Sequence, residues 1–311
     1  LTLGRDDAHP AEDYMLATGL GDTRKAAEES ARQELRKRLR KKAELTISQL
    51  HEGENTFLAE AVKELPEEVI RPSKQDVPAV EIRKYWFDKV TGTFYTLGAL
   101  DRDRVIAQWR SKMWKNARAA EQLFQTARNN HRADNYRTSM EEYLLSLERF
   151  QQAVRCGILL SAVRPEGLTG LFAADEDDAV RIGEIRSGFN ALLQEFHLER
   201  IAGDGQWVPP GSTPSTPLTV QVVAGPEEKP IPEIPIRFDF VEGKGKLEPA
   251  AKTGADGRAA TRIERLVGTG RSYAEIESRV DPGRMTTQAD LSGLEIPKAT
   301  FRVILRSTQN T

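Results

Sequence analysis

The chain has 311 residues, 30% of them charged, and its formal net charge is only −2. This balance of signs excludes a globally basic or acidic surface, so we expect no nucleic-acid partner. The length is enough for two or three domains with separate cores. Because Cys156 is the only cysteine, an intrachain disulfide is excluded. Its place on an apolar predicted helix favours a buried, inert thiol.

Residues 1–105 predict a small α+β domain. A short strand is expected at 14–18, and Asp22 or Thr23 is placed to cap a long helix that runs to about Leu50. Apolar and small residues recur every four positions along this helix, so its buried stripe winds around the axis and suits a twisted sheet. That stripe consists of Ala27, Ala31, Leu35, Leu39, Ala43 and Ile47.

Two further segments complete this first domain. Residues 56–65 predict a short helix that ends near Pro66. Residues 80–87 and 93–100 are rich in aromatic and β-branched side chains, and the turn residues 89–92 lie between them. The pattern predicts an antiparallel β-hairpin.

Residues 106–202 predict a helical hairpin or bundle. Apolar side chains keep spacings of three and four, first from Val105 to Ala127 and again from Tyr136 to Val154. A third helix is expected from Ile182 to Phe196. Trp109 and Trp114 are five residues apart and point in different directions, so we expect one in the core and the other either exposed or packed between domains.

Residues 203–217 predict a semi-extended linker, because their Pro, Gly and Ser content does not form a packed element. Residues 218–311 change to strand periodicity, with alternating segments such as 234–240 and 299–305 separated by the turn residues 254–258. Short strands at this spacing predict an immunoglobulin-like β-sandwich of two sheets. The expected fold class is therefore multidomain α+β.

The first domain resembles a family of bacterial envelope lipoproteins typified by a small Helicobacter outer-membrane antigen, and also the N-terminal part of a flagellar assembly protein. The resemblance rests on residues 17–19 before the Ala-rich helix, on Trp86, and on residues 95–102 (Tyr-Thr-Leu-Gly-Ala-Leu-Asp-Arg). It covers about a third of the chain and implies a secreted, often lipid-anchored protein with no known chemistry. The lipidated cysteine of that family is missing from this sequence, so an anchor would need a cysteine upstream of Leu1.

The last part of the chain is similar to bacterial immunoglobulin-like domains of the invasin and intimin type. Residues 235–238, the glycine pattern of 243–247, residues 253–259 and residues 273–276 carry this similarity. It implies a spacer or adhesion module outside the cytoplasm, on a fold that hosts many binding roles.

Two motifs have both a structural and a functional interpretation. Gly19-Leu20-Gly21 has two glycines of a dinucleotide loop, but Arg24 replaces the third, which favours an ordinary helix start with glycines at the turn. The basic run of residues 36–42 keeps Leu35 and Leu39 on an apolar face. We expect a solvated helix face, with an acidic partner or anionic phospholipid as the alternative.

The remaining polar clusters predict no catalytic, cofactor-binding or metal-binding residues. The acidic residues 175–178 lack the alternating ligands of a calcium loop and favour a helix start instead. The four histidines form no zinc-type pair, and no Gly-x-Ser-x-Gly signature is present. These histidines are His9, His51, His131 and His197.

These features together predict a non-enzymatic structural or scaffolding protein of the cell envelope that mediates protein–protein assembly. The sandwich would be its spacer or adhesion module, and its partners would be envelope proteins, neighbouring subunits or a wall polymer. We expect it in the periplasm or at the outer membrane, with a signal sequence removed. The alternative is a regulatory binding module that activates a wall-building or secretion machine through the helical region.

Overall fold

In a computed structural model, the chain divides into two compact units. The structure describes residues 9–52, 57–72, 76, 80–163, 181–209, 211–267, 272–285 and 289–305. The first unit comprises the described residues up to Glu121 and those from Arg149 to Ile182, and the second comprises Gln122–Glu148 and the described residues from Gly183 onward. The domain boundaries proposed from the sequence stay predictions.

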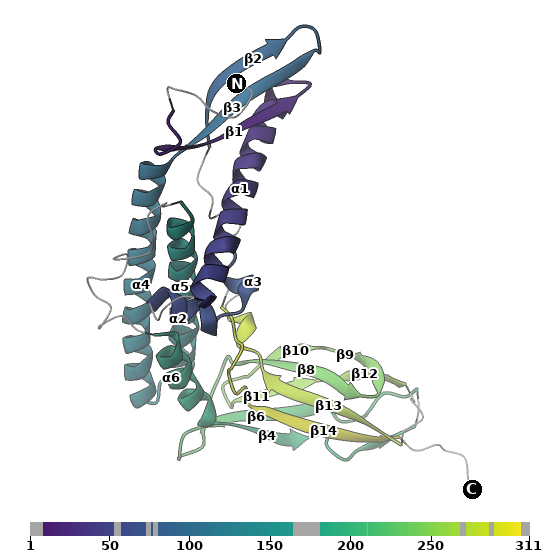
Figure 1. Cartoon of the computed structure of the whole chain (residues 1–311). Helices are drawn as coiled ribbons and strands as arrows, with labels where there is room; N and C mark the ends of the chain where they lie inside the picture. Colours follow the sequence, from purple (N-terminus) through teal and green to yellow (C-terminus); the bar gives the residue numbers. More distant parts are fainter. Residues whose placement is uncertain are drawn as a thin grey trace. The chain divides into compact units, whose positions relative to one another are not determined.

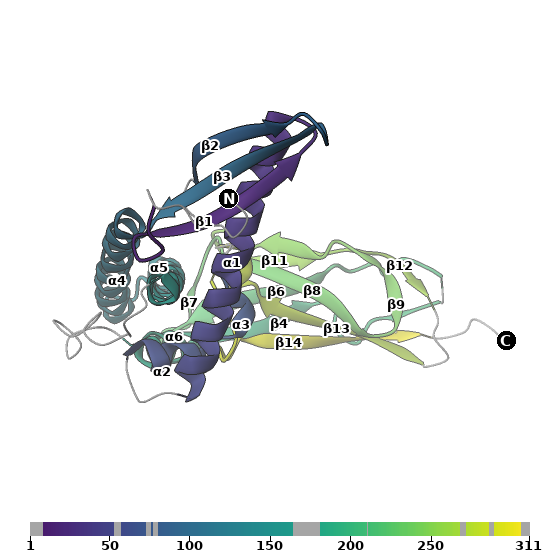
Figure 2. The same cartoon turned by 45° about the horizontal axis from the view of Figure 1, so that its top comes forward.

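The first unit contains a three-stranded antiparallel sheet with the order β1-β3-β2. Its strands are β1 (Tyr14–Gly21), β2 (Glu81–Asp88) and β3 (Thr93–Asp101), and β2 and β3 form the expected hairpin. Helix α1 (Arg24–Glu52) packs along β1 and β3 (Figures 1 and 2).

The predicted stripe of α1 is confirmed, because all six of its residues are at most 2% exposed. The backbone N–H of Ala26 donates to Oγ1 of Thr23 at 3.2 Å, so Thr23 is the residue that caps the helix.

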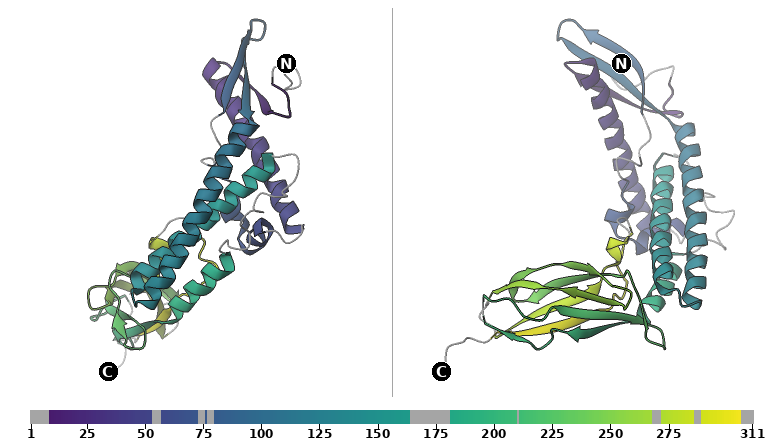
Figure 3. Two further views of the ribbon diagram at one scale, coloured as in Figure 1. Left: turned by 90° about the vertical axis from the view of Figure 1, so that its left-hand side faces the viewer. Right: turned by 180° about the vertical axis from the view of Figure 1, so that it is seen from behind.

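Helices form the remainder of the first unit and lead into the second. Short helices α2 (Phe57–Glu64) and α3 (Glu67–Ile70) precede β2. Helices α4 (Arg102–Arg132) and α5 (Tyr136–Val163) each contribute residues to both units. They run side by side in opposite directions (Figures 1 and 3), as the sequence predicted.

The α4–α5 pair is fastened near its turn by polar and aromatic contacts. Oγ of Ser139 donates to the backbone carbonyl of Ala127 at 2.8 Å, and the rings of Phe124 and Tyr143 lie 6.1 Å apart. Because Ser139 is fully buried, this bond satisfies a hydroxyl that would otherwise cost about 1–3 kcal/mol.

The second unit contains helix α6 (Ile182–Gln194) from Gly183 onward and an immunoglobulin-like β-sandwich, which confirms the expected fold class. One sheet has the order β10-β8-β13-β14-β5, and the other has the order β11-β6-β4 with β7 paired to β6. Strands β9 and β12 form a separate two-stranded ribbon. The strands of this unit have the bounds β4 Phe196–Ala202, β5 Trp207–Val208, β6 Leu218–Ala224, β7 Lys229–Pro230, β8 Pro235–Glu242, β9 Lys244–Leu247, β10 Ala250–Lys252, β11 Arg258–Thr261, β12 Ile263–Val267, β13 Tyr273–Val280 and β14 Lys298–Leu305.

Alternation along the strands builds the sandwich core. Alternate residues of β13 from Ala274 to Val280 are buried, whereas those from Tyr273 to Arg279 face outward. Phe301, Val303 and Leu305 of β14 continue the inner face. Because successive side chains of a strand point to opposite faces, one face builds the core and the other presents polar groups.

Two sequence predictions at the start of the sandwich are wrong. Residues 196–202 form strand β4, which pairs with β6, and not the end of a helical region. The expected linker also contains a strand, because β5 pairs in parallel with β14, and Val208 is only 4% exposed. The backbone N–H of Gly205 donates to the carbonyl of Arg302, so this segment covers an edge of the five-stranded sheet.

Candidate functional site

The hairpin tip, residues 85–95, presents aromatic side chains on both faces of the first sheet. Trp86 and Tyr95 are paired in register and their rings stack at 4.8 Å, with an interplanar angle of 6°. Phe87 and Phe94 form the next pair, 4.5 Å apart. Directly opposed side chains share a face and successive pairs alternate, so one aromatic pair lies on each face.

Much of this aromatic surface is in contact with solvent. Phe87 is 47% exposed, Tyr85 is 39% exposed, and Val90 at the turn is 95% exposed. Leu20, which is paired in register with Tyr95, is 52% exposed. Exposed apolar side chains gathered in one place mark interaction surfaces.

Polar contacts hold the aromatic side chains in place. The guanidinium carbon of Arg24 lies 3.6 Å from the centre of the Tyr85 ring, and the Tyr85 hydroxyl donates to Oε1 of Glu28 at 2.8 Å. This hydrogen bond is the main reason that the pKa of Glu28 is lowered. The side chain of Tyr85 is therefore fixed against α1 before any partner binds, which reduces the entropy lost on binding.

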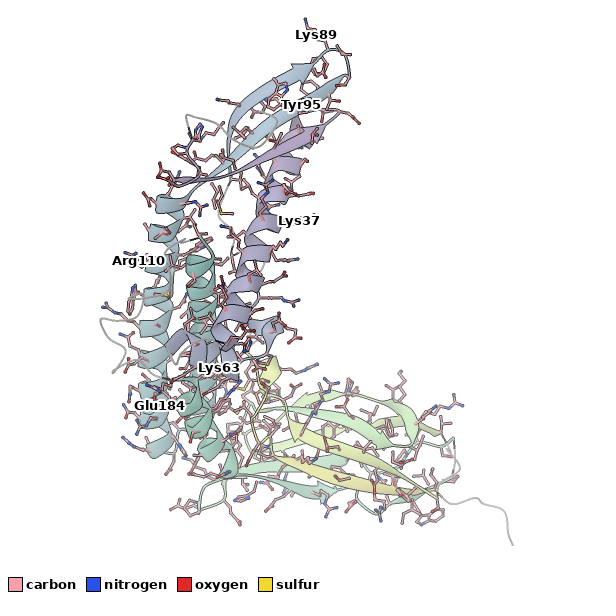
Figure 4. All side chains as sticks on the ribbon, in the orientation of Figure 1. Lys37, Lys63, Lys89, Tyr95, Arg110 and Glu184 are labelled. Carbon is pink, nitrogen blue, oxygen red and sulfur yellow. The ribbon has the colours of Figure 1, made fainter. Side chains whose placement is uncertain are left out.

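The turn at the end of the hairpin is also fixed. Asp88 accepts the backbone N–H of Val90 at 2.9 Å and the hydroxyl of Thr91 at 2.8 Å. These bonds, led by that from Thr91, lower the pKa of the Asp88 carboxyl. Lys89 extends beyond the end of the hairpin (Figure 4). The tip thus offers one cation next to apolar side chains.

The basic run of α1 forms a helix face on which several cations have partners. Arg36 pairs with Glu29 at 3.1 Å, and Arg38 pairs with Glu34 at 3.1 Å. Arg38 also donates to the backbone carbonyl of Leu16 at 2.8 Å and so covers the outer edge of β1. Lys37 is exposed and its side chain projects from the helix (Figure 4). Binding of phospholipid or of an acidic partner here stays a prediction.

The glycines of Gly19-Leu20-Gly21 have a packing role. Both lie within β1 and not in a turn, and a Cβ atom at Gly21 would lie 2.6 Å from the backbone nitrogen of Ala27. At Gly19 a Cβ would overlap the backbone of Ala27 and Ala31. The two glycines therefore let strand and helix approach closely, and the sequence interpretation of a glycine turn is wrong.

His131 and His9 each make a separate contact within the fold. His131 contacts Glu195, with 2.9 Å between Nε2 and Oε1, and Oη of Tyr136 donates to Oε2 of the same carboxylate at 3.1 Å. His9 packs edge-on against Tyr14 at 4.9 Å. Within the described ranges, no three His, Cys, Asp or Glu side chains are grouped to hold a metal ion. Residues 175–178 lie outside the described residues.

The contacts among Tyr136, Glu195 and His131 resemble the parts of a proton relay but suit a structural role. Burial, followed by the hydrogen bond to Glu195, raises the pKa of Tyr136 far above its ordinary value. A nucleophile or general base needs the opposite shift. Through these contacts the three side chains join the turn between α4 and α5 to the start of β4.

The buried thiol and one buried tryptophan confirm the sequence predictions. Cys156 is buried, and desolvation raises its pKa to about 11, so little thiolate forms at neutral pH. Trp109 is 1% exposed and its indole N–H donates to the carbonyl of Asp76 at 3.1 Å. Trp114 is half-buried.

The hollows of the described surface include two that contain titratable side chains. One of about 380 Å³ lies beside the start of α4 and contains Arg104 paired with Glu81. The other, about 530 Å³, lies along β4 at His197 and Glu199. In each of them a polar side chain faces solvent, and neither contains a nucleophile next to a base.

None of the described helices combines the length and the apolar character needed to cross a bilayer. No protein-family model matches the chain, and no curated protein matches it.

Among solved structures, the chain is similar to the secreted protein HP1454 from the human pathogen Helicobacter pylori, with 16% identity and a TM-score of 0.29. That similarity covers 50% of this chain and 55% of the other. It is also similar to the D0-D1 domain of intimin, with 20% identity, a TM-score of 0.23, and coverage of 35% and 46%. The chain thus spans about half the length of each of these structures.

Proposed function

We propose that the chain is a non-enzymatic scaffolding protein of the cell envelope that assembles with partner proteins or neighbouring subunits through its hairpin tip. The sandwich is its spacer or adhesion module. The observation that carries the proposal is the exposure of Phe87, Tyr85, Val90 and Leu20 around a fixed turn. Aromatic side chains beside a cation are typical of the centres of protein interfaces.

The geometry of the tip favours contact with a protein over a small-molecule site. The exposed side chains lie on both faces of a hairpin, so they form a projection and not a hollow. Drug-sized ligands and cofactors bind in concave pockets that cover most of their surface. A projection with ordered aromatic rings instead fits a groove on a larger partner.

The outer edge of β2 is a second feature that favours a protein partner. Among the described strands, β2 pairs only with β3, so its outer edge is unpaired in the sheet. An unpaired edge can accept a further strand from a partner. The location in the envelope rests on the family resemblances of the sequence and is part of the proposal.

Photo-crosslinking in living cells tests the proposal. A photoreactive phenylalanine analogue at Phe87 should give an adduct with one protein of the envelope, and the adduct should be lost on Val90→Asp. The analogue at Leu145, an exposed position of α5, is the control. An adduct from position 145 together with none from position 87 would instead support the regulatory module that acts through the helices.

A further inference from the structure

A row of apolar side chains crosses the outer face of the five-stranded sheet at one end. Trp207 of β5 is paired in register with Ile304 of β14, and Ile304 is paired with Tyr273 of β13. All three belong to the outward-facing set, because their neighbours Val208, Leu305 and Ala274 are buried. With strands about 4.8 Å apart, the row spans roughly 10 Å.

Trp207 at one end of the row is exposed, and Ile304 and Tyr273 are half-buried. Trp207 is 58% exposed, the largest exposed fraction among the aromatic residues that the structure describes as exposed. Val208, and not Trp207, is the buried residue of β5.

Next to the row is a neutral ion pair. Nη2 and Nε of Arg302 lie 2.7 and 3.3 Å from Oε1 of Glu275, and the guanidinium lies 4.7 Å from the centre of the Tyr273 ring. The two charges cancel. A guanidinium has five donors and a carboxylate has about four acceptor sites, so both side chains can make further hydrogen bonds.

We propose that this surface, made of Trp207, Ile304, Tyr273 and the Arg302–Glu275 pair, binds a saccharide. A sugar ring has an apolar face that can lie on the indole and hydroxyl groups at its rim that can both donate and accept. The proposal goes beyond the hairpin-tip contact and does not depend on it, because it concerns the other unit.

Three arguments favour a saccharide over an ion, a peptide strand or a protein as the ligand of this surface. The neutral ion pair disfavours an anion or a cation. An added peptide strand needs a free sheet edge, but β5 occupies the edge of β14 at Ile304 and Leu305. A stable protein interface buries about 800 Å² per partner, whereas one aromatic side chain buries about 150–250 Å² and the row has only two.

The experiment is a titration of the full chain with four neutral tetrasaccharides, which are chitotetraose, cellotetraose, maltotetraose and mannotetraose. Calorimetry and saturation-transfer NMR measure binding. We expect at least one to bind saturably, and Trp207→Ala to weaken its affinity about tenfold or more. Trp207→Phe, which keeps a flat ring, should retain part of the affinity. Leu145→Ala, which shortens an exposed side chain elsewhere, should leave it unchanged.

The variants also decide between the saccharide and the alternatives. Double substitution of Arg302→Ala and Glu275→Ala should weaken binding while the thermal melt of the protein stays cooperative. The absence of saturable binding by all four sugars, or equal affinity of Trp207→Ala, would overturn the proposal. Self-association of the wild type that Trp207→Ala abolishes would assign the surface to a second copy and would also overturn it.

Discussion

Oε1 of Glu195 lies 2.9 Å from Nε2 of His131, although 64 residues separate them in the sequence. The other carboxylate oxygen accepts the hydroxyl proton of Tyr136. One side chain just after α6 thus holds both sides of the turn between α4 and α5.

Glu195→Gln tests the strength of this contact. The amide keeps the size of the side chain but removes the charged carboxylate that contacts His131 and accepts the Tyr136 hydroxyl. Because the Glu195 side chain is 43% exposed, solvent screening limits the loss, and we expect the free energy of unfolding to fall by about 1 kcal/mol. Denaturant titration measures it. Glu199→Gln, at an exposed position of β4, is the control and should change stability by less than about 0.5 kcal/mol.

High pH should reveal the burial of Tyr136. Burial and the hydrogen bond to Glu195 raise its pKa above the ordinary value of about 10. The unfolded chain therefore releases the phenol proton at a lower pH than the folded chain does. Linkage then predicts that the free energy of unfolding falls as the pH rises above about 10.

Tyr136→Phe should reduce the steepness of that fall. Burial also raises the pKa of Tyr143, but Tyr143 is present in both proteins, so the difference between them isolates Tyr136. Urea titrations on both sides of pH ~10 give the two slopes. Parallel slopes would show that Tyr136 ionises alike in the folded and unfolded chains.

Gly19→Ala should destabilise the first unit. The added methyl group would overlap the backbone of Ala27 and Ala31, which are held in a helix. Forcing β1 and α1 apart should cost at least about 1–3 kcal/mol. The matched control is Gly283→Ala, where the nearest atom, Oδ1 of Asp281, lies 3.4 Å from the new Cβ. Equal stability of the two variants would contradict the close packing of β1 on α1.

The Cys156 thiol should react slowly in the folded protein. Desolvation raises its pKa to about 11, and the side chain is buried. At about pH 8 a disulfide reagent should label the native chain at least tenfold more slowly than the chain in denaturant, since only the thiolate attacks. Labelling at similar rates in both states would mean that the helix around Cys156 opens readily.

Sequence periodicity predicted the elements whose contacts are local or repetitive. The stripe from Ala27 to Ile47 and the turn between β2 and β3 were visible because spacing alone defines them. Strand β4 was missed because Phe196 follows Leu192 at a helical spacing of four. Only its pairing with β6 decides that the backbone is extended.

The surfaces were harder to predict than the elements. The aromatic residues of the hairpin were expected on strands, but their exposure depends on where α1 begins relative to the sheet. Trp207 was assigned to a linker because prolines and glycines surround it, and a strand of two residues leaves no periodic pattern. The contact between Glu195 and His131 joins distant segments, so no local spacing indicates it.

The location of the native protein tests the central claim most directly. Intact-mass measurement of the full-length protein from fractionated cells should find it in the periplasmic or outer-membrane fraction with its signal sequence removed. An added mass of acyl chains on a cysteine upstream of Leu1 would further identify a lipid anchor. An unprocessed protein in the cytoplasmic fraction would contradict the proposal of an envelope scaffold.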